Sequence, residues 1–311
     1  MTAPELTRPE LRQTGLAPPA AVVARAAKRP LRAAMAWKAM SRNRLAVAGG
    51  VVILLVIAIS ALAPLLAPHD PIVGESVNRL LPLGAPGHLL GTDGQGRDIL
   101  SRLIWGGRYS LTVAIVPVLC AIPVSLFVGI AAGYFGGRIG NAVMRVLDVV
   151  FAFPLVLLAI AIAAVLGPGL RNMMFAIWIT LIPYMTRVVY TSTVQETQKD
   201  YVEAAKAAGS SQLQVLRMQL LPNVLSPLVV YGTTLCGVMI TTAAGLSFLG
   251  VGVTPPAPDW GVMTADGRDV LLEGHPSVAT IPGLAILLVS VAFNLLGDGI
   301  RDALDPRKQT A

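Results

Sequence analysis

The sequence predicts an all-α, polytopic membrane protein with six transmembrane helices. Hydrophobic residues make up 54% of the chain and charged residues only 13%, and the mean hydropathy is +0.68, a balance typical of polytopic membrane proteins. Six segments contain no Asp, Glu, Lys or Arg, and most reach the ~20 residues that a helix needs to cross the hydrocarbon core. These runs are unbroken and lack the alternation of a membrane β-barrel.

The uncharged segments define the predicted spans in chain order. The fourth is short until Val188, Val189 and Tyr190 are added, which places Arg187 near an interface where its long side chain can reach water. Only residues 167–169 join the third span to the fourth, and so short a link makes them antiparallel neighbours. The six segments are residues 45–68, 110–133, 149–170, 172–186, 223–258 and 276–297.

These spans form one membrane domain, residues 45–298, between two tails. The N-terminal tail, residues 1–44, is rich in Pro, Ala and Arg and is expected to be partly disordered. Its residues 31–40 favour a basic amphipathic helix with Trp37 at the lipid interface. The C-terminal tail comprises residues 299–311.

The distribution of basic residues predicts the orientation in the membrane. All but six of the 24 Lys and Arg residues lie in the two tails, in the link 134–148 or in the region 187–222, and such segments stay on the cytoplasmic side. Both termini are therefore expected inside. The net charge of +7 is explained by contact with anionic membrane lipid and requires no nucleic acid. The six exceptions are Arg79, Arg97, Arg102, Arg108, Arg171 and Arg268.

Two segments on the predicted outer side are rich in turn residues. The first, residues 91–108, reads GTDGQGRDILSRLIWGGR, which predicts a loop followed by an interfacial helix with Leu100, Ile104 and Trp105 on one side. The second begins a helix at Asp259-Trp260-Gly261. Both helices are expected to lie on the outer membrane surface.

A polar stretch between the fourth and fifth spans, residues 200–222, predicts a short helix-turn-helix on the cytoplasmic side. Its alanines favour a helix that another protein can approach closely, and Gly209 supplies a left-handed cap. Ser210 or Ser211 can cap a second helix, which Pro222 is expected to end. An ordinary amphipathic connector is the alternative interpretation.

This stretch resembles the EAA loop of the membrane subunits of bacterial ATP-driven importers: Glu203-Ala204-Ala205, then Gly209, then Leu221-Pro222. One departure is Gln219, which stands where the family usually has an apolar residue, although Leu220 can serve instead. With the GTDGQGRD segment, the LSFLGVG run at residues 246–252 and the DWG segment, most of the chain resembles the dipeptide and oligopeptide importer permeases of the DppC/OppC type.

The resemblance implies a type I ABC importer permease fold in the bacterial cytoplasmic membrane and a set of partners. These are a second, homologous permease subunit of the DppB/OppB type, two cytoplasmic ABC ATPase subunits or domains, and an extracytoplasmic substrate-binding protein. ATP and Mg²⁺ would bind the ATPase partners. The chain itself carries no GxxxxGK[ST] phosphate loop, since no lysine follows a glycine.

Two groups of site residues follow. The ATPase-coupling residues are expected to be Glu203, Ala204, Ala205, Lys206, Gly209, Leu221 and Pro222. On the outer face, charge, Gly and Trp gather in residues 93–105 and 259–269. The expected contacts of the binding protein there are Asp93, Gly96, Arg97, Asp98, Trp260, Asp266 and Arg268.

No catalytic or metal site is predicted. The three histidines, His69, His88 and His275, lie at scattered positions in the outer segments, without the spacing of a metal-binding helix. The Asp- and Gly-rich stretches lack the graded ligand spacing of a calcium loop. We therefore expect a transport subunit without an enzymatic site or a cofactor of its own.

Short peptides are the expected substrate, on the basis of the resemblance alone. Permeases for nickel or glutathione look similar, and both remain open. The uncharged spans argue against an ion-coupled secondary transporter or channel, which usually needs ionisable groups inside the membrane. A membrane scaffold without transport activity is a further alternative.

Overall fold

The computed structural model describes residues 40–41 and 43–304. The predictions for residues 1–39 and for the end of the C-terminal tail lie outside these residues. The described part contains no strand, only two isolated bridges between single residues. Its helices are α3 (Arg44–Ala61), α4 (Ala63–Leu66), η2 (Ser76–Asn78), α5 (Ile99–Phe135), α6 (Gly137–Phe151), α7 (Leu155–Leu166), α8 (Leu170–Thr197), α9 (Asp200–Ala207), α10 (Gln212–Gln214), η3 (Val215–Leu220), α11 (Leu221–Phe248), α12 (Trp260–Val270) and α13 (Ser277–Leu304).

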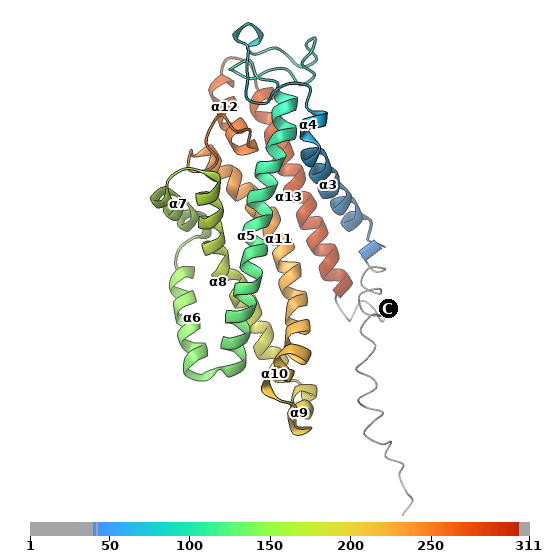
Figure 1. The fold of residues 1–311 in the computed structure, drawn as a ribbon, viewed down its shortest axis with the longest axis vertical. Coiled ribbons are helices and arrows are strands. Elements are labelled where there is room, and N and C mark those ends of the chain that lie inside the picture. Colours follow the sequence, from blue (N-terminus) through green and yellow to red (C-terminus); the bar gives the residue numbers. More distant parts are fainter. Residues whose placement is uncertain (1–39, 42, 305–311) are drawn as a thin grey trace, which may run out of the picture.

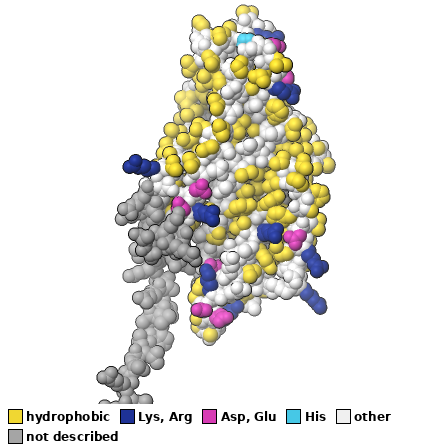
Figure 2. Space-filling view, turned by 180° about the vertical axis from the view of Figure 1, so that it is seen from behind, with side chains coloured by type: hydrophobic (Ala, Val, Ile, Leu, Met, Phe, Trp, Pro, Cys, Tyr) yellow, Lys and Arg dark blue, Asp and Glu magenta, His cyan; other side chains and the backbone are white. Residues whose placement is uncertain are grey.

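The prediction of an all-α membrane domain is confirmed. Five helices are long and apolar enough to cross a membrane: α3, α5, α8, the continuous α10–η3–α11 and α13. They run along the long axis of the molecule (Figure 1). Hydrophobic side chains cover much of the middle of the face seen in Figure 2. Residues 67–98 with α12 form one end of the bundle, here named the loop end, and α9, α10 and η3 form the opposite end, named the α9 end.

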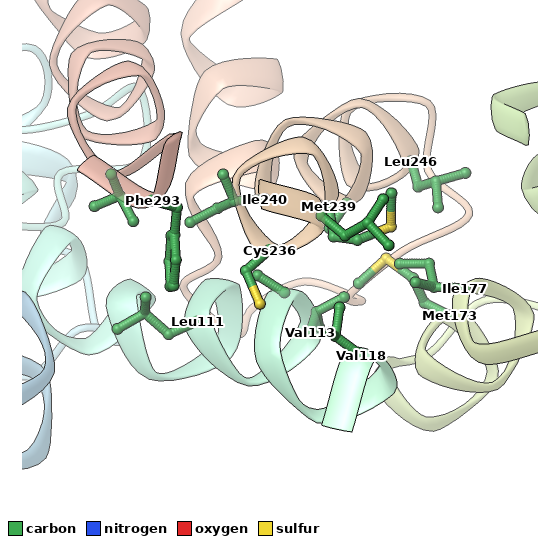
Figure 3. Packing of buried hydrophobic residues seen from close by; sticks show 14 of the residues in the cluster. Leu111, Val113, Val118, Met173, Ile177, Cys236, Met239, Ile240, Leu246 and Phe293 are labelled. Carbon is green, nitrogen blue, oxygen red and sulfur yellow. The ribbon is translucent and has the colours of Figure 1, made fainter. Parts of the chain in front are cut away.

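Helix α5 lies at the centre, in contact with α8, α11 and α3, while α13 packs between α11 and α3. Figure 3 shows Leu111 of α5 beside Phe293 of α13, and Val113 and Val118 of α5 beside Cys236 of α11, in the buried core. Small residues let the helices approach closely, as is common in membrane bundles. A Cβ atom at Gly49 would lie 2.6 Å from the carbonyl oxygen of Ala292, so α3 and α13 meet backbone to backbone.

The third predicted span is not one continuous helix. It is broken into α6 and α7, and residues 140–151 and 155–166 are bent by 84° with respect to each other. The break falls at Pro154, whose ring disfavours a helical conformation at Phe153 and which cannot donate a backbone hydrogen bond. Helix α7 has 12 residues, well short of the ~20 needed to span, so the bent pair α6–α7 is the sixth span only if both parts are counted together.

The separate interfacial helix predicted at residues 99–108 is also wrong, because these residues are the first turns of α5. The sequence predicted a second, separate helix from residue 110 onward. In the fold Gly106 and Gly107 instead make room for neighbours: a Cβ atom at Gly106 would lie 2.9 Å from Cδ1 of Trp260, and one at Gly107 would overlap the Ser60 hydroxyl. Glycine costs a helix only about 1 kcal/mol relative to alanine, which packing can offset.

Candidate functional site

The first half of the α9 end matches its prediction closely. Helix α9 is followed by a left-handed residue, Gly209, with φ +81°. The Gly209 N–H donates to the Lys206 carbonyl and the Ser210 N–H to the Ala205 carbonyl, both at 3.0 Å, which is the hydrogen-bond pattern of a Schellman cap. Space around Gly209 is open, so its backbone angle alone makes glycine the favoured residue here.

The second half differs from the prediction in one respect. Ser211 caps α10 with a reciprocal capping box to Gln214, as the serine pair indicated. Pro222 does not end this helix, because the chain continues helically from Gln212 to Phe248. The π-helical segment η3 just before Pro222 shifts the hydrogen-bond register, and this accommodates the missing N–H and the bulk of the proline ring.

The α9 end is tied to three long helices. Val202, Val215 and Leu220 are buried together, with Tyr134 of α5 packed against them. The Lys206 ammonium lies 5.4 Å from the centre of the Tyr134 ring, within the range of a cation–π contact. The burial of Leu220 agrees with the idea that it takes the apolar role expected beside Gln219.

Polar contacts add to this anchoring. The Asn223 side-chain amide in α11 donates to the Tyr201 hydroxyl at 2.9 Å, and that hydroxyl donates to Glu196 of α8. The element is therefore connected to α5, α8 and α11.

The outward surface of the α9 end combines small, charged and apolar residues. Glu203, Ala204, Lys206 and Gly209 are exposed, whereas Ala205, Leu221 and Pro222 are partly buried. Sequence reasoning did not assign a docking role to Leu213 and Met218, which are each 60% exposed. An exposed leucine and methionine beside a small-residue helix form a surface suited to a protein partner. That signal was present in the sequence as apolar residues within a polar stretch.

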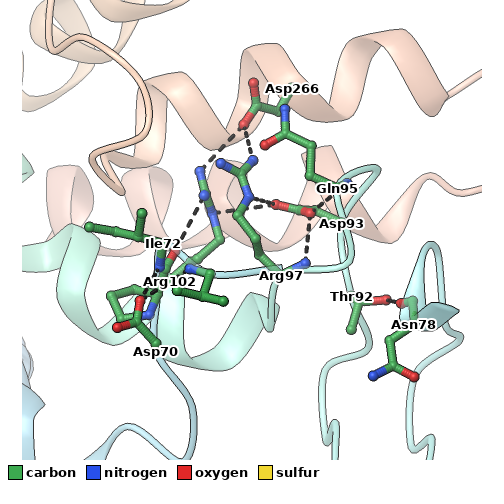
Figure 4. A network of polar contacts seen from close by, with 11 residues as sticks. Asp70, Ile72, Asn78, Thr92, Asp93, Gln95, Arg97, Arg102 and Asp266 are labelled. Carbon is green, nitrogen blue, oxygen red and sulfur yellow. Dashed lines mark hydrogen bonds and ion pairs between the residues drawn. The ribbon is translucent and has the colours of Figure 1, made fainter. Parts of the chain in front are cut away.

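At the loop end, two arginines and two aspartates form an ion network (Figure 4), in which all the side chains are buried except that of Asp266, which is 27% exposed. Arg97 Nε donates to Asp93 Oδ2 at 2.7 Å, and Arg97 Nη2 donates to Asp266 Oδ2 at 2.8 Å. Arg102 approaches the same two oxygens at 3.5 and 3.3 Å. The charges balance, so the cost of removing each from water is offset by its neighbours. The network joins the loop, the start of α5 and helix α12.

Most residues predicted to contact a binding protein are therefore internal. Asp93, Arg97, Asp98 and Trp260 have buried side chains, and Gly96 lies in a tight turn. Arg268 is 64% exposed, and Gln95 at the loop tip is also exposed. The predicted contact with a binding protein stays a prediction, with the buried residues shaping the surface that Gln95 and Arg268 present.

Asp259 holds α12 against the bundle. Its carboxylate accepts hydrogen bonds from the backbone N–H groups of Gly261 and Val262, at 3.0 and 3.3 Å, and from the Ser110 hydroxyl at 2.7 Å. Burial raises the pKa of Asp259, and the hydrogen bonds oppose that shift only in part. Trp260 Nε1 donates to the Leu103 carbonyl at 2.9 Å, so α12 is fixed on α5 at two points.

Comparison with known proteins identifies the family of this chain. Residues 125–310 match the family described as binding-protein-dependent transport system inner membrane component, and residues 32–82 match the N-terminal TM domain of oligopeptide transport permease C. The chain is 42% identical to the glutathione transport system permease protein of Pectobacterium atrosepticum over 87% of its length and 90% of the relative's.

Two further relatives are similarly close. The di/tripeptide transport system permease protein of Pseudomonas aeruginosa is 41% identical, over 88% of this chain and 92% of its own. The dipeptide transport system permease protein of Haemophilus influenzae is 40% identical, over 87% and 93% respectively. The predicted family is confirmed: the chain belongs to the inner membrane components of binding-protein-dependent transport systems.

Proposed function

We propose that this chain is the permease subunit of an ATP-driven importer that moves short peptides across the bacterial cytoplasmic membrane. The relatives named for dipeptide and di/tripeptide transport support the substrate class. The α9 end is the main structural support for the mechanism, because it presents exposed Leu213 and Met218 on an element anchored to α5, α8 and α11.

In this proposal two ABC ATPase subunits or domains bind the α9 end on the cytoplasmic side, with ATP and Mg²⁺ held by those partners. Both termini of this chain are cytoplasmic as well. Closure of the ATPase pair on ATP displaces the α9 end, and its anchoring carries the displacement into the spans, which switch between two arrangements. A second, homologous permease subunit of the DppB/OppB type completes the pathway.

Gly209→Glu tests this coupling. The substitution places a side chain at φ +81° and a negative charge on the docking surface, so we expect peptide uptake to fall at least about tenfold, equivalent to ~1.4 kcal/mol of lost coupling. Gly209→Asn is the matched control, since asparagine tolerates the left-handed conformation without adding charge. Uptake by Gly209→Glu at the wild-type rate, in a properly inserted protein, contradicts the proposed docking.

The substrate requires a separate experiment, because the relatives include a glutathione permease. Uptake of labelled dipeptides, longer peptides, glutathione and Ni²⁺ is compared in cells with and without the gene. We expect peptide uptake to be lost. Loss of glutathione or nickel uptake with undiminished peptide uptake would contradict the proposed peptide substrate. The proposed importer mechanism would be unaffected.

The loop end is proposed to face outward and receive a substrate-binding protein. Cysteines introduced at Gln95 and Ala265 provide crosslinking positions, in a background where the exposed Cys120 is changed to serine. We expect crosslinks that strengthen when the binding protein holds a peptide. Failure at both positions with transport intact assigns the loop end a purely structural role.

A further inference from the structure

Two of the three histidines meet at the loop end, although the sequence predicted that they were scattered. His69 follows α4, His88 lies in the loop, and both lie beside Asp98, the residue that caps the start of α5. Each of the three offers one ligand atom, and these atoms lie within 4.8 Å of one another. The cluster thus draws on three separate parts of the chain, which explains why sequence spacing did not reveal it.

Both imidazole rings bring Nδ1 close to the Asp98 carboxylate. His88 Nδ1 lies 2.9 Å from Asp98 Oδ1, and His69 Nδ1 lies 3.9 Å from Asp98 Oδ2. The imidazole rings stack with centroids 4.6 Å apart and planes 26° apart. Small side-chain adjustments would allow both nitrogens and one carboxylate oxygen to bind one ion at the ~2.0–2.2 Å typical of Zn–N and Zn–O bonds.

The carboxylate is held in place by its neighbours. Asp98 Oδ2 accepts hydrogen bonds from both the backbone N–H and the hydroxyl of Ser101, each at 2.7 Å. The same hydroxyl accepts the backbone N–H of His69 at 3.0 Å. Hydrogen-bonded outer partners of this kind orient metal ligands and increase affinity.

Burial leaves the cluster open on one side. The Asp98 side chain is 1% exposed and that of His88 11%, whereas that of His69 is 42% exposed. An ion can therefore enter past His69 without unfolding the loop. Three protein ligands would leave a further coordination position for water or for a group from an approaching molecule.

We propose that His69, His88 and Asp98 form a binding site for a divalent transition metal, with Zn²⁺ as the best-fitting probe. The two imidazole nitrogens are borderline ligands that suit Zn²⁺, Ni²⁺ or Cu²⁺, and Zn²⁺ also accepts an aspartate oxygen. Mg²⁺ and Ca²⁺ prefer sites made entirely of oxygen ligands. The bound ion links the end of α4, the loop and the start of α5, and so stiffens the outer loop independently of the proposed peptide transport.

Zn²⁺ titration of the intact transporter, purified with a histidine-free affinity tag, tests the site. We compare wild type with His69→Gln and His88→Gln, and with His275→Gln as matched control, since His275 lies at the same end outside the cluster. Asp98 is left unchanged because it also caps α5. Co²⁺ in place of Zn²⁺ reports the coordination geometry through its visible absorption.

We expect the wild type and His275→Gln to bind one Zn²⁺ per chain that Mg²⁺ does not displace. His69→Gln and His88→Gln should each weaken this binding at least about tenfold. His69 is exposed, so its variant tests the site even if His88→Gln destabilises the loop. Absence of Zn²⁺ binding by wild type, or equal binding by His69→Gln, overturns the proposal and leaves the His88–Asp98 contact a structural hydrogen bond only.

Discussion

The two ends of the bundle use their polar residues in opposite ways. At the loop end, Asp93, Arg97 and Arg102 are buried and pair with one another and with Asp266 of α12. At the α9 end, Glu203 and Lys206 are exposed, and the residues that stand out to solvent include the apolar Leu213 and Met218.

This difference indicates that the loop end contributes mainly to stability and that the α9 end is available for contact with a partner. Buried, mutually paired charges contribute to one fixed conformation, and removing one partner is costly. Exposed apolar side chains contribute little to the fold of the single chain and become useful when a partner covers them. Substitutions at the loop end should therefore change stability first, and those at the α9 end should change transport first.

The largest expected effect is that of Arg97→Met. Arg97 makes the two shortest ion pairs of the network, at 2.7 and 2.8 Å. Its loss leaves the longer contact to Arg102 as the ion pair of Asp93, beside the backbone N–H groups of residues 95 and 97. We expect the free energy of unfolding to fall by about 3–5 kcal/mol, measured by denaturation of the purified protein in detergent.

Arg268→Met is the control for this substitution, because Arg268 belongs to the same end but is 64% exposed. Its loss should cost about 0–1 kcal/mol. Equal losses for the two variants would show that the network does not stabilise the loop end, and the contrast between the two ends would fail.

Gly267→Ala should have the next largest effect. A Cβ atom at this position would lie 2.6 Å from the Ala279 Cα, so α12 would have to move away from α13. Overpacking of this kind costs about 1–3 kcal/mol. Gly245→Ala is the matched control, because no atom lies within 4 Å of the added carbon; there the change should be neutral or stabilising in a thermal denaturation assay.

Local sequence patterns predicted most of the fold. Uncharged apolar runs identified five continuous spans, and the Ala-Gly-Ser pattern at residues 204–211 identified α9, its cap and the start of α10. These features depend on neighbours in sequence. The bend at Pro154 was missed because the apolar run continues through it, and the continuity of α5 was missed because the partners of Gly106 and Gly107 are Trp260 and Ser60.

Tertiary contacts explain the remaining differences. The Asp93 and Asp266 carboxylates share Arg97 across a long sequence separation, so this pairing could not be read from the local pattern. The pairing of His69 with His88 has the same cause. The positions of these residues between the predicted spans placed them at the correct end of the molecule. They did not predict which side chains would be in contact.

Two substitutions of Asp259 distinguish the contribution of its helix cap to stability from the contribution of its charge. Asp259→Ala removes the acceptor for the Gly261 and Val262 N–H groups and should cost about 1–2 kcal/mol. Asp259→Asn keeps one acceptor oxygen and can donate to the Ser110 hydroxyl, so its cost should be smaller. Thermal denaturation of both variants beside wild type measures the difference.

The raised pKa of Asp259 adds a dependence on pH. The folded state holds this proton more tightly than the unfolded state, whose value is near 3.8, so stability falls as pH rises from that value through the folded pKa. Asp259→Asn has no proton to lose at this position. We expect wild type to lose stability relative to Asp259→Asn over this pH range, and a constant difference would contradict the assigned role of burial.

Leu213→Ser should have the smallest effect on stability and still impair transport. Leu213 is 60% exposed, so its replacement should change the free energy of unfolding by no more than about 0.5 kcal/mol. If an ATPase covers this side chain, its loss should weaken docking by about 1–3 kcal/mol, and uptake should fall about tenfold.

Val229→Ser is the matched control, since Val229 is an exposed apolar residue of α11 away from the α9 end. Normal uptake by Leu213→Ser, together with unchanged copurification of the ATPase, would remove Leu213 from the docking surface and leave the small-residue face of α9 to make the contact.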